Sequence, residues 1–170
     1  PPASVFKDLP ITYTDGNWPK NDNRQYQYAR TVYQGVVSSV NAIAAHTLDF
    51  IGTEYGYSFA KYNFGQKSLV ESYPTEYEVK SDVGLAPLAL GALTLGSTVQ
   101  EMATAYATFA NDGVFRQSRL YTKVYNSDGE LVLDNTQDSR KILSEKSVNY
   151  MNYCLYNAAN HGTGGAALFG

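Results

Sequence analysis

Apolar residues recur with the 3.6-residue period of an amphipathic helix in three parts of the chain. The first part covers residues 31–51 and pauses at two consecutive serines. The other two cover about residues 98–110 and 145–159. A shorter helix is predicted over residues 56–65. The pattern therefore predicts a segment that is mostly helical.

Local signals mark the ends of these helices. Thr98 and Glu101 form a T-x-x-E capping box, and Gly113 follows an Asn-Asp pair as a left-handed stop. Gly52 and Gly65 are predicted to end the two helices that precede them. The apolar face of the helix after Thr98 is predicted to comprise Val99, Met102, Ala103, Tyr106 and Ala110.

One β-hairpin is predicted where apolar and polar residues alternate on both sides of a turn. The sequence RLYTKVYNSDGELVLD places this hairpin at residues 120–134, with the turn at 126–129. Residues 1–28 combine Pro, Gly, Asn and Asp, so they are predicted to form a long surface loop. The tyrosine-rich residues 66–81 are also predicted to be a loop.

Composition limits the classes of function. With 170 residues, of which 44% are hydrophobic, the chain has enough apolar material for one core, and a single globular unit is expected. A net charge of −3 with scattered Lys and Arg gives no basic surface for a phosphate backbone, so nucleic acid is excluded as a partner. No apolar run has the length of a membrane span and no signal pattern begins the chain, so any targeting segment is expected outside it.

Neither a metal nor a cofactor is expected. The single cysteine, Cys154, rules out an internal disulfide and is predicted to be a small buried residue in a helix. His46 and His161 are far apart in the sequence, so no metal-ligand spacing is present.

The two serines at the pause, in SSVNAIAAH, admit two interpretations. A serine before a helix is usually a cap whose hydroxyl accepts a backbone N–H and stabilises the helix by about 1 kcal/mol. Alternatively, Ser39 and Asn41 belong to an active site, in which case Ser39 needs a base that SSVNAIAAH does not contain.

A longer series of motifs favours the active site. PASVFKDLP, WPKND, SSVNAIAAH, LALGALTLGSTVQEMATAYATFANDGVF, KVYNSDGELV and ILSEKSVNYMNYCLYNAANHGTGGAA follow one another in this order. In this order the motifs resemble the transpeptidase domain of class A penicillin-binding proteins. The resemblance implies an α+β fold in which helices cover an antiparallel sheet. Residues 1–170 would be part of this domain, from the S-x-N region to just before the K-T-G strand.

The resemblance implies serine acyl transfer built from three elements, S-x-x-K, S-x-N and K-T-G. The expected partners are a peptidoglycan stem peptide and β-lactam antibiotics. Ser39 takes the proton-relay role of S-x-N, and Asn41 takes the role that holds the substrate amide. The family works on the outer face of the cytoplasmic membrane, so the parent protein is expected there, with its anchor outside this chain.

The other two catalytic elements are not recognised in this sequence. Ser4 with Lys7 and Ser58 with Lys61 match S-x-x-K, but the first pair lies in a predicted loop and the second follows S-x-N in the wrong order. Thr163, in HGTGG, resembles the turn before the K-T-G strand and is predicted to shape the edge of the active site, or to contact the substrate directly.

Two matters stay open at the level of sequence. Trp18, in GNWPKN, either lines the substrate cleft or anchors its own loop. The chain is either the middle of an active enzyme or an inactive binding or scaffold module of the same origin. If flanking parts of the domain are missing, unpartnered apolar faces favour binding to those parts or self-association.

Overall fold

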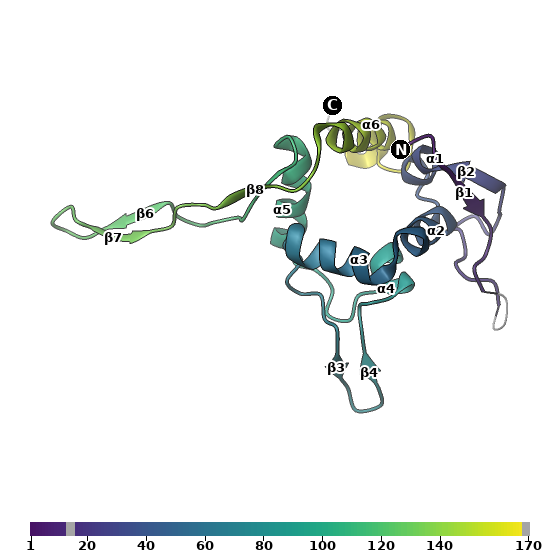
Figure 1. Cartoon of the computed structure of the whole chain (residues 1–170), viewed down its shortest axis with the longest axis horizontal. Helices are drawn as coiled ribbons and strands as arrows, with labels where there is room; N and C mark the ends of the chain where they lie inside the picture. Colours follow the sequence, from purple (N-terminus) through teal and green to yellow (C-terminus); the bar gives the residue numbers. More distant parts are fainter. Residues whose placement is uncertain (13–15, 168–170) are drawn as a thin grey trace.

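The helices follow one another around a ring, as the computed structural model shows (Figure 1). The structure describes residues 1–12 and 16–167. The two ends of the ring meet where the last long helix, α6, packs on the first, α1. The helices are α1 (Val32–Val37), α2 (Asn41–Ile51), α3 (Thr53–Ser58) continued by a π-helical turn (Phe59–Asn63), α4 (Leu85–Leu90), α5 (Val99–Ala110), α6 (Glu145–His161) and a final 3₁₀ turn (Gly165–Ala167).

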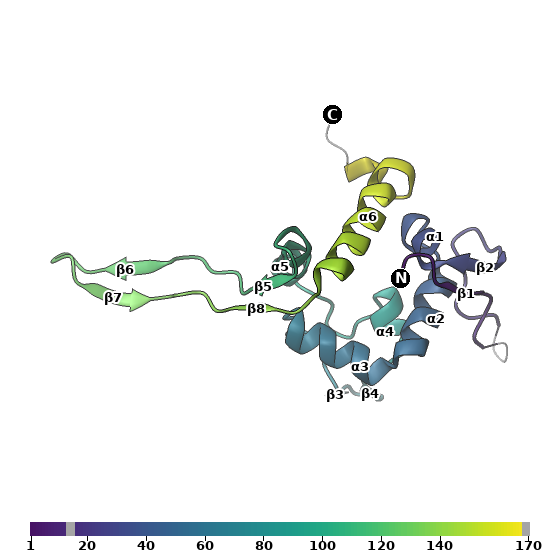
Figure 2. The same cartoon turned by 45° about the horizontal axis from the view of Figure 1, so that its top comes forward.

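Short antiparallel strand pairs complete the described part of the chain. A long two-stranded arm leaves the ring between α5 and α6 and carries the tip hairpin far from the helices (Figures 1 and 2). The pairs are β1 (Val5–Asp8) with β2 (Tyr28–Thr31), β3 (Tyr73–Pro74) with β4 (Val79–Lys80), β5 (Val114–Arg116) with β8 (Ser139–Lys141), and β6 (Lys123–Tyr125) with β7 (Leu131–Asp134).

The α+β class and its helices agree with the sequence. α1 and α2 are separated at the two serines, and α5 begins at its Thr98–Glu101 capping box as predicted. Helix α6 follows Ser144 and extends two residues past the predicted end, to His161. The predicted hairpin is present as β6 and β7, and Cys154 is buried in α6. The helix expected over residues 56–65 begins earlier, at Thr53.

Several elements were not predicted, among them the β5–β8 pair. The loop assignment for residues 1–28 is wrong at β1, which pairs with β2 more than twenty residues later. The loop assignment for residues 66–81 is wrong at β3 and β4, which form a second, very short hairpin. Helix α4 was missed because it contains Pro87, which a helix accepts in its first turn.

The predicted apolar face of α5 exists but is not part of the core. Met102 is 43% exposed and Tyr106 is 52% exposed, whereas Thr104 and Thr108 are buried. The two threonines lie toward β5, beside Val114 and Arg116. Met102 and Tyr106 instead line a groove that α5 shares with α4 and α6. The helix therefore buries its small threonine side and presents its larger apolar side to the inside of the ring.

Glu101 connects the start of α5 to the loop that follows α3. Its carboxylate accepts hydrogen bonds from the Thr98 N–H at 2.9 Å, the Ser68 N–H at 2.9 Å and the Ser68 hydroxyl at 2.7 Å. Burial opposes ionisation, but these hydrogen bonds outweigh it and lower the pKa of Glu101 to about 2. The ionised carboxylate therefore stabilises the folded chain.

Replacing Glu101 with glutamine should destabilise the protein in a pH-dependent way. At pH 7 we expect a loss of about 1–3 kcal/mol, because an amide has one acceptor oxygen where the carboxylate has two. A depressed pKa contributes stability above the unfolded value of about 4.5, and this stability is lost as the pH falls toward about 2. Urea unfolding of both proteins at several pH values should show that the difference between their free energies of unfolding shrinks as the pH falls from about 4.5 to about 2. A difference in unfolding free energy that stays constant down to pH 2 would contradict the lowered pKa of Glu101. Glu54→Gln, in the first turn of α3, is the control at pH 7.

Candidate functional site

Ser39 lies at the reversal between α1 and α2 with an unusual backbone conformation. Its φ is 51°, in the left-handed region that a residue with a Cβ seldom adopts. The reversal is tight because α1 and α2 touch at Gly35, where a Cβ would lie 2.4 Å from Cγ2 of Ile43. The side chain of Ser39 is exposed and makes no hydrogen bond to any residue that the structure describes. Its hydroxyl is therefore available to a reactant.

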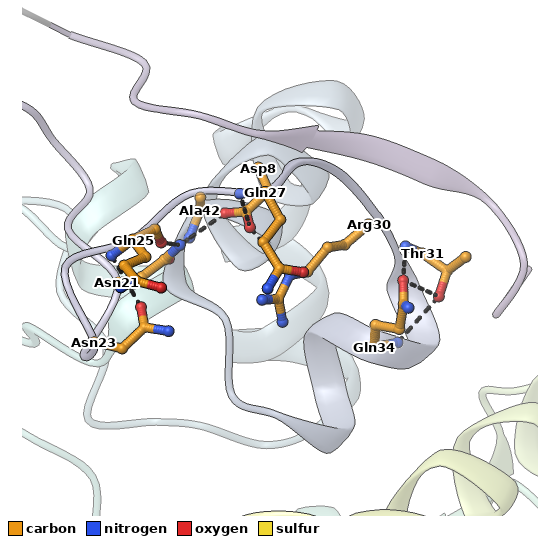
Figure 3. Close-up of polar contacts among 9 residues, drawn as sticks. All are labelled: Asp8, Asn21, Asn23, Gln25, Gln27, Arg30, Thr31, Gln34 and Ala42. Atoms are coloured by element: carbon orange, nitrogen blue, oxygen red, sulfur yellow. Dashed lines mark hydrogen bonds and ion pairs between the residues drawn. The ribbon is translucent and has the colours of Figure 1, made fainter.

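Ser39 is not the cap of α2, so that interpretation is wrong. The N-cap position is Val40, whose side chain cannot accept a hydrogen bond. Instead the N–H of Ala42, in the first turn of α2, donates to Oδ1 of Asn21 at 3.1 Å (Figure 3). A side chain from 21 residues upstream thus supplies the contact that a local serine usually makes.

Asn21 belongs to a buried polar network beneath the start of α2 (Figure 3). Its Nδ2 donates to Oδ1 of Asp8 at 2.7 Å and to the carbonyl of Gln25 at 2.8 Å. Oδ2 of Asp8 accepts the N–H of Gln27 at 2.9 Å and lies 3.1 Å from Nε of Arg30 as an ion pair. The Asp8 side chain is fully buried, so these partners compensate for its desolvation.

Asn41 is held by the segment that contains Trp18. Nδ2 of Asn41 donates to the carbonyl of Lys20 at 2.8 Å. Trp18 is half-buried, and its backbone forms hydrogen bonds with Ile11 and Thr12 that close the loop around it. These are backbone bonds, so both roles of the Trp18 side chain stay predictions, and the connection through Lys20 places its segment beside Asn41.

The turn that contains Thr163 lies against the end of α1. The N–H of Thr163 donates to the carbonyl of Val37 at 3.2 Å. At Gly162 a Cβ would lie only 2.0 Å from that same carbonyl oxygen, so the two backbones are in direct contact. Val37 is two residues before Ser39, and the side chain of Thr163 is exposed. The structure thus brings the turn predicted from HGTGG next to the predicted S-x-N element.

Two hollows border this site. Ser39, Val40 and Asn41 line one side of a groove of about 430 Å³ whose other walls come from α1, α2, α4 and Met151 of α6. Ser39 also lines a smaller polar hollow of about 140 Å³ together with Ser38, Asn21 and Arg30. Within residues 1–12 and 16–167, no group of His, Cys, Asp or Glu is arranged to hold a metal ion.

Neither S-x-x-K match supplies a serine with a free lysine base. Ser4 and Lys7 lie at an extended strand, where residues three apart point to opposite sides. Lys61 donates to the Tyr57 hydroxyl at 2.9 Å and to the carbonyl of Leu69 at 2.7 Å. The hydrogen bond to Tyr57 raises the pKa of Lys61 despite the opposing effect of burial, so its ammonium does not act as a base for Ser58.

Comparison with known proteins identifies the family. Residues 1–168 match the family described as "Penicillin binding protein transpeptidase domain", and the chain belongs to this family. It is 29% identical to penicillin-binding protein 1A of Clostridium botulinum (strain Hall) over 99% of its length and 20% of the relative. It is 30% identical to penicillin-binding protein 1F of Bacillus subtilis (strain 168) over 95% of its length and 21% of that protein. The chain thus spans about a fifth of these relatives.

Solved structures share the fold. The D,D-transpeptidase domain of a peptidoglycan glycosyltransferase from Eggerthella lenta superposes with a TM-score of 0.71 at 21% identity, covering 99% of this chain and 46% of that one. The penicillin G acyl-enzyme complex of penicillin-binding protein A from M. tuberculosis has a TM-score of 0.71 at 16% identity, covering 94% and 39%. The ring of helices is therefore part of the transpeptidase fold.

The contact between Gly162 and Val37 gives a test of the site geometry. Gly162→Ala should destabilise the protein by about 1–3 kcal/mol, because the new methyl group cannot coexist with the Val37 carbonyl at 2.0 Å. Gly165→Ala is the matched control, since its nearest neighbour would be 3.8 Å away. Thermal unfolding of both variants measures the difference, and equal melting temperatures would show that the turn does not pack on α1.

Proposed function

We propose that this chain supplies the S-x-N element of a serine-type peptidoglycan D,D-transpeptidase. The observation that carries the proposal is Ser39 itself, held at φ 51° with a free hydroxyl beside Asn41. A non-glycine residue in this conformation costs about 1–3 kcal/mol and persists where the surrounding structure imposes it, often at functional sites. The same conformation ends α1, because the N–H groups of Ser39 and Val40 donate to the carbonyls of Val36 and Gly35.

In the proposed reaction a serine outside this chain attacks the carbonyl of the penultimate D-alanine in a stem peptide. A lysine one helical turn away takes the serine proton, and Ser39 passes a proton to the leaving nitrogen of the terminal D-alanine. Asn41 holds the substrate amide. An acceptor amine then displaces the enzyme serine and completes the new peptide bond. A β-lactam enters at the first step, and its ring nitrogen is the group that leaves.

The grooves on the inside of the ring favour binding of another segment of the same parent protein. Three grooves of about 370, 320 and 430 Å³ all share Met151 and are lined mainly by apolar side chains. Pro1 and Pro2 line one of them, and Ser39 and Asn41 line another. An apolar helix that leads into Pro1 and carries S-x-x-K would cover these surfaces and bring its serine toward Ser39. In its absence, the same surfaces favour self-association.

The proposal extends to where the parent protein works. None of the helices in the described part of the chain is long and apolar enough to cross a bilayer. We place the parent protein on the outer face of the cytoplasmic membrane, where peptidoglycan strands are cross-linked.

Ser39→Ala in the full-length parent protein tests the proton relay. Acylation by a β-lactam should slow by about 10²- to 10⁴-fold, the usual cost of losing a general acid or base. Ser38→Ala is the matched control, because Ser38 is the exposed neighbouring residue and occupies the C-cap of α1. Stopped-flow measurement of acylation gives both rates. A normal rate for Ser39→Ala would sink the proposed function.

The 170-residue chain alone should form no covalent adduct with penicillin. Neither S-x-x-K match offers a free lysine base on the same helix as its serine, since Ser4 lies by a strand and Lys61, in helical register with Ser58, is engaged by Tyr57 and Leu69. Intact-protein mass spectrometry after long incubation is the measurement. A stoichiometric mass increase mapped to Ser4, Ser39 or Ser58 would show that a different serine attacks. If the full-length parent also forms no adduct, it is an inactive binding or scaffold module.

A further inference from the structure

We infer that Asn21 is a positioning residue that sets the place of Ser39 and Asn41 for catalysis. The inference rests on the proposed function, because it assigns Asn21 a role only if the S-x-N element takes part in acyl transfer. Under this inference, Asn21 does not touch the reacting atoms. It acts through the backbone of α2 and through its neighbour Lys20.

The first argument is that Asn21 replaces a helix cap. The early N–H groups of a helix have no partner within the helix, and Val40 provides none for α2. Oδ1 of Asn21 accepts the N–H of Ala42, the residue directly after Asn41. Asn21 is 6% exposed, and both ends of its amide are hydrogen-bonded. The first turn of α2 is therefore located by this amide and not by the S-x-N residues.

The second argument is that one dipeptide holds two consecutive residues of the site. The carbonyl of Lys20 accepts Nδ2 of Asn41, while the side chain of Asn21 accepts the N–H of Ala42. Movement of this dipeptide would rotate the Asn41 amide and shift the start of α2 together. Misplacement of a substrate-positioning group by about 1 Å can cost a factor of about 10² in rate.

The third argument is that Asn21 is itself fixed from below. Asp8 on β1 is 0% exposed and holds Asn21 at 2.7 Å, while Gln27 and Arg30 hold Asp8 (Figure 3). A buried carboxylate that lost the Asn21 amide would be left with an unsatisfied oxygen, which gives the network a single preferred arrangement. The strand pair β1–β2 thereby transmits a fixed position to α2.

The test is Asn21→Ala in the full-length parent protein, with acylation measured at a saturating β-lactam concentration. We expect the rate constant to fall about 10- to 100-fold while most molecules still become labelled. A purely structural role would lower the labelled fraction or the melting temperature and leave the rate constant of the folded molecules unchanged. An unchanged rate constant would therefore overturn the inference.

Asp82→Asn is the matched control. Asp82 is also 0% exposed and accepts the N–H groups of Val70 and Thr94, but it has no contact with α2 through hydrogen bonds. We expect it to lower the melting temperature without slowing acylation. An equal slowing in Asp82→Asn would show a global effect and would also overturn the inference. Failure of Ser39→Ala to slow acylation is a separate result, since it removes the proposed function itself.

A reciprocal exchange keeps the test decisive if Asn21→Ala does not fold. Asn21→Asp alone sets two carboxylates 2.7 Å apart, whereas Asn21→Asp combined with Asp8→Asn restores one amide and one carboxylate. We expect the double variant to acylate at least about 10-fold faster than Asn21→Asp. No gain in rate, at equal labelled fractions, would count against Asn21 as a positioning residue.

Discussion

The hydrogen bond from the Ala42 N–H to the side chain of Asn21 is the interaction on which the site depends. A hydroxyl that accepts a backbone N–H at a helix start has its oxygen held at that N–H, which limits where it can meet a reactant. Because Asn21 takes over this contact, Ser39 is released from it and the chain can reverse at φ 51°. The structural requirement of α2 and the chemical requirement of Ser39 are thus met by different residues.

Close contacts at two glycines restrict the same region. Gly35 brings α1 onto Ile43 of α2, and Gly162 brings the turn after α6 onto Val37. Any side chain at these positions would separate the elements that carry Ser39, Asn41 and Thr163. The S-x-N turn is therefore enclosed by close packing on one side and by the Asp8–Asn21 network on the other, so that its shape follows from residues of this chain.

Sequence predicted what depends on near neighbours. Helix α5 carries its own capping box, and its start was found, whereas the strand pair β1–β2 and the cap from Asn21 join residues about twenty positions apart. WPKND and KDLP contain Asn21 and Asp8, but no local rule assigns either residue a buried partner. The resemblance to penicillin-binding proteins, not the pattern of residues, pointed to Ser39 and Asn41. The apolar face of α5 was visible in sequence, but sequence does not say whether its partner lies in the same chain.

The proposed acyl transfer needs positioned groups and a base, and this chain differs in how it meets the two needs. The Asn21 and Asp8 side chains under α2 are hydrogen-bonded to nearby residues, whereas the grooves around Met151 are largely apolar and open. A lysine acts as a base only where its surroundings favour the neutral amine, and the hydrogen bond from Lys61 to Tyr57 does the opposite by raising its pKa. The positions of Ser39 and Asn41 are thus determined by contacts among residues of this segment, whereas the only lysine that follows a serine within a helix of the described chain, Lys61, is held as a hydrogen-bond donor.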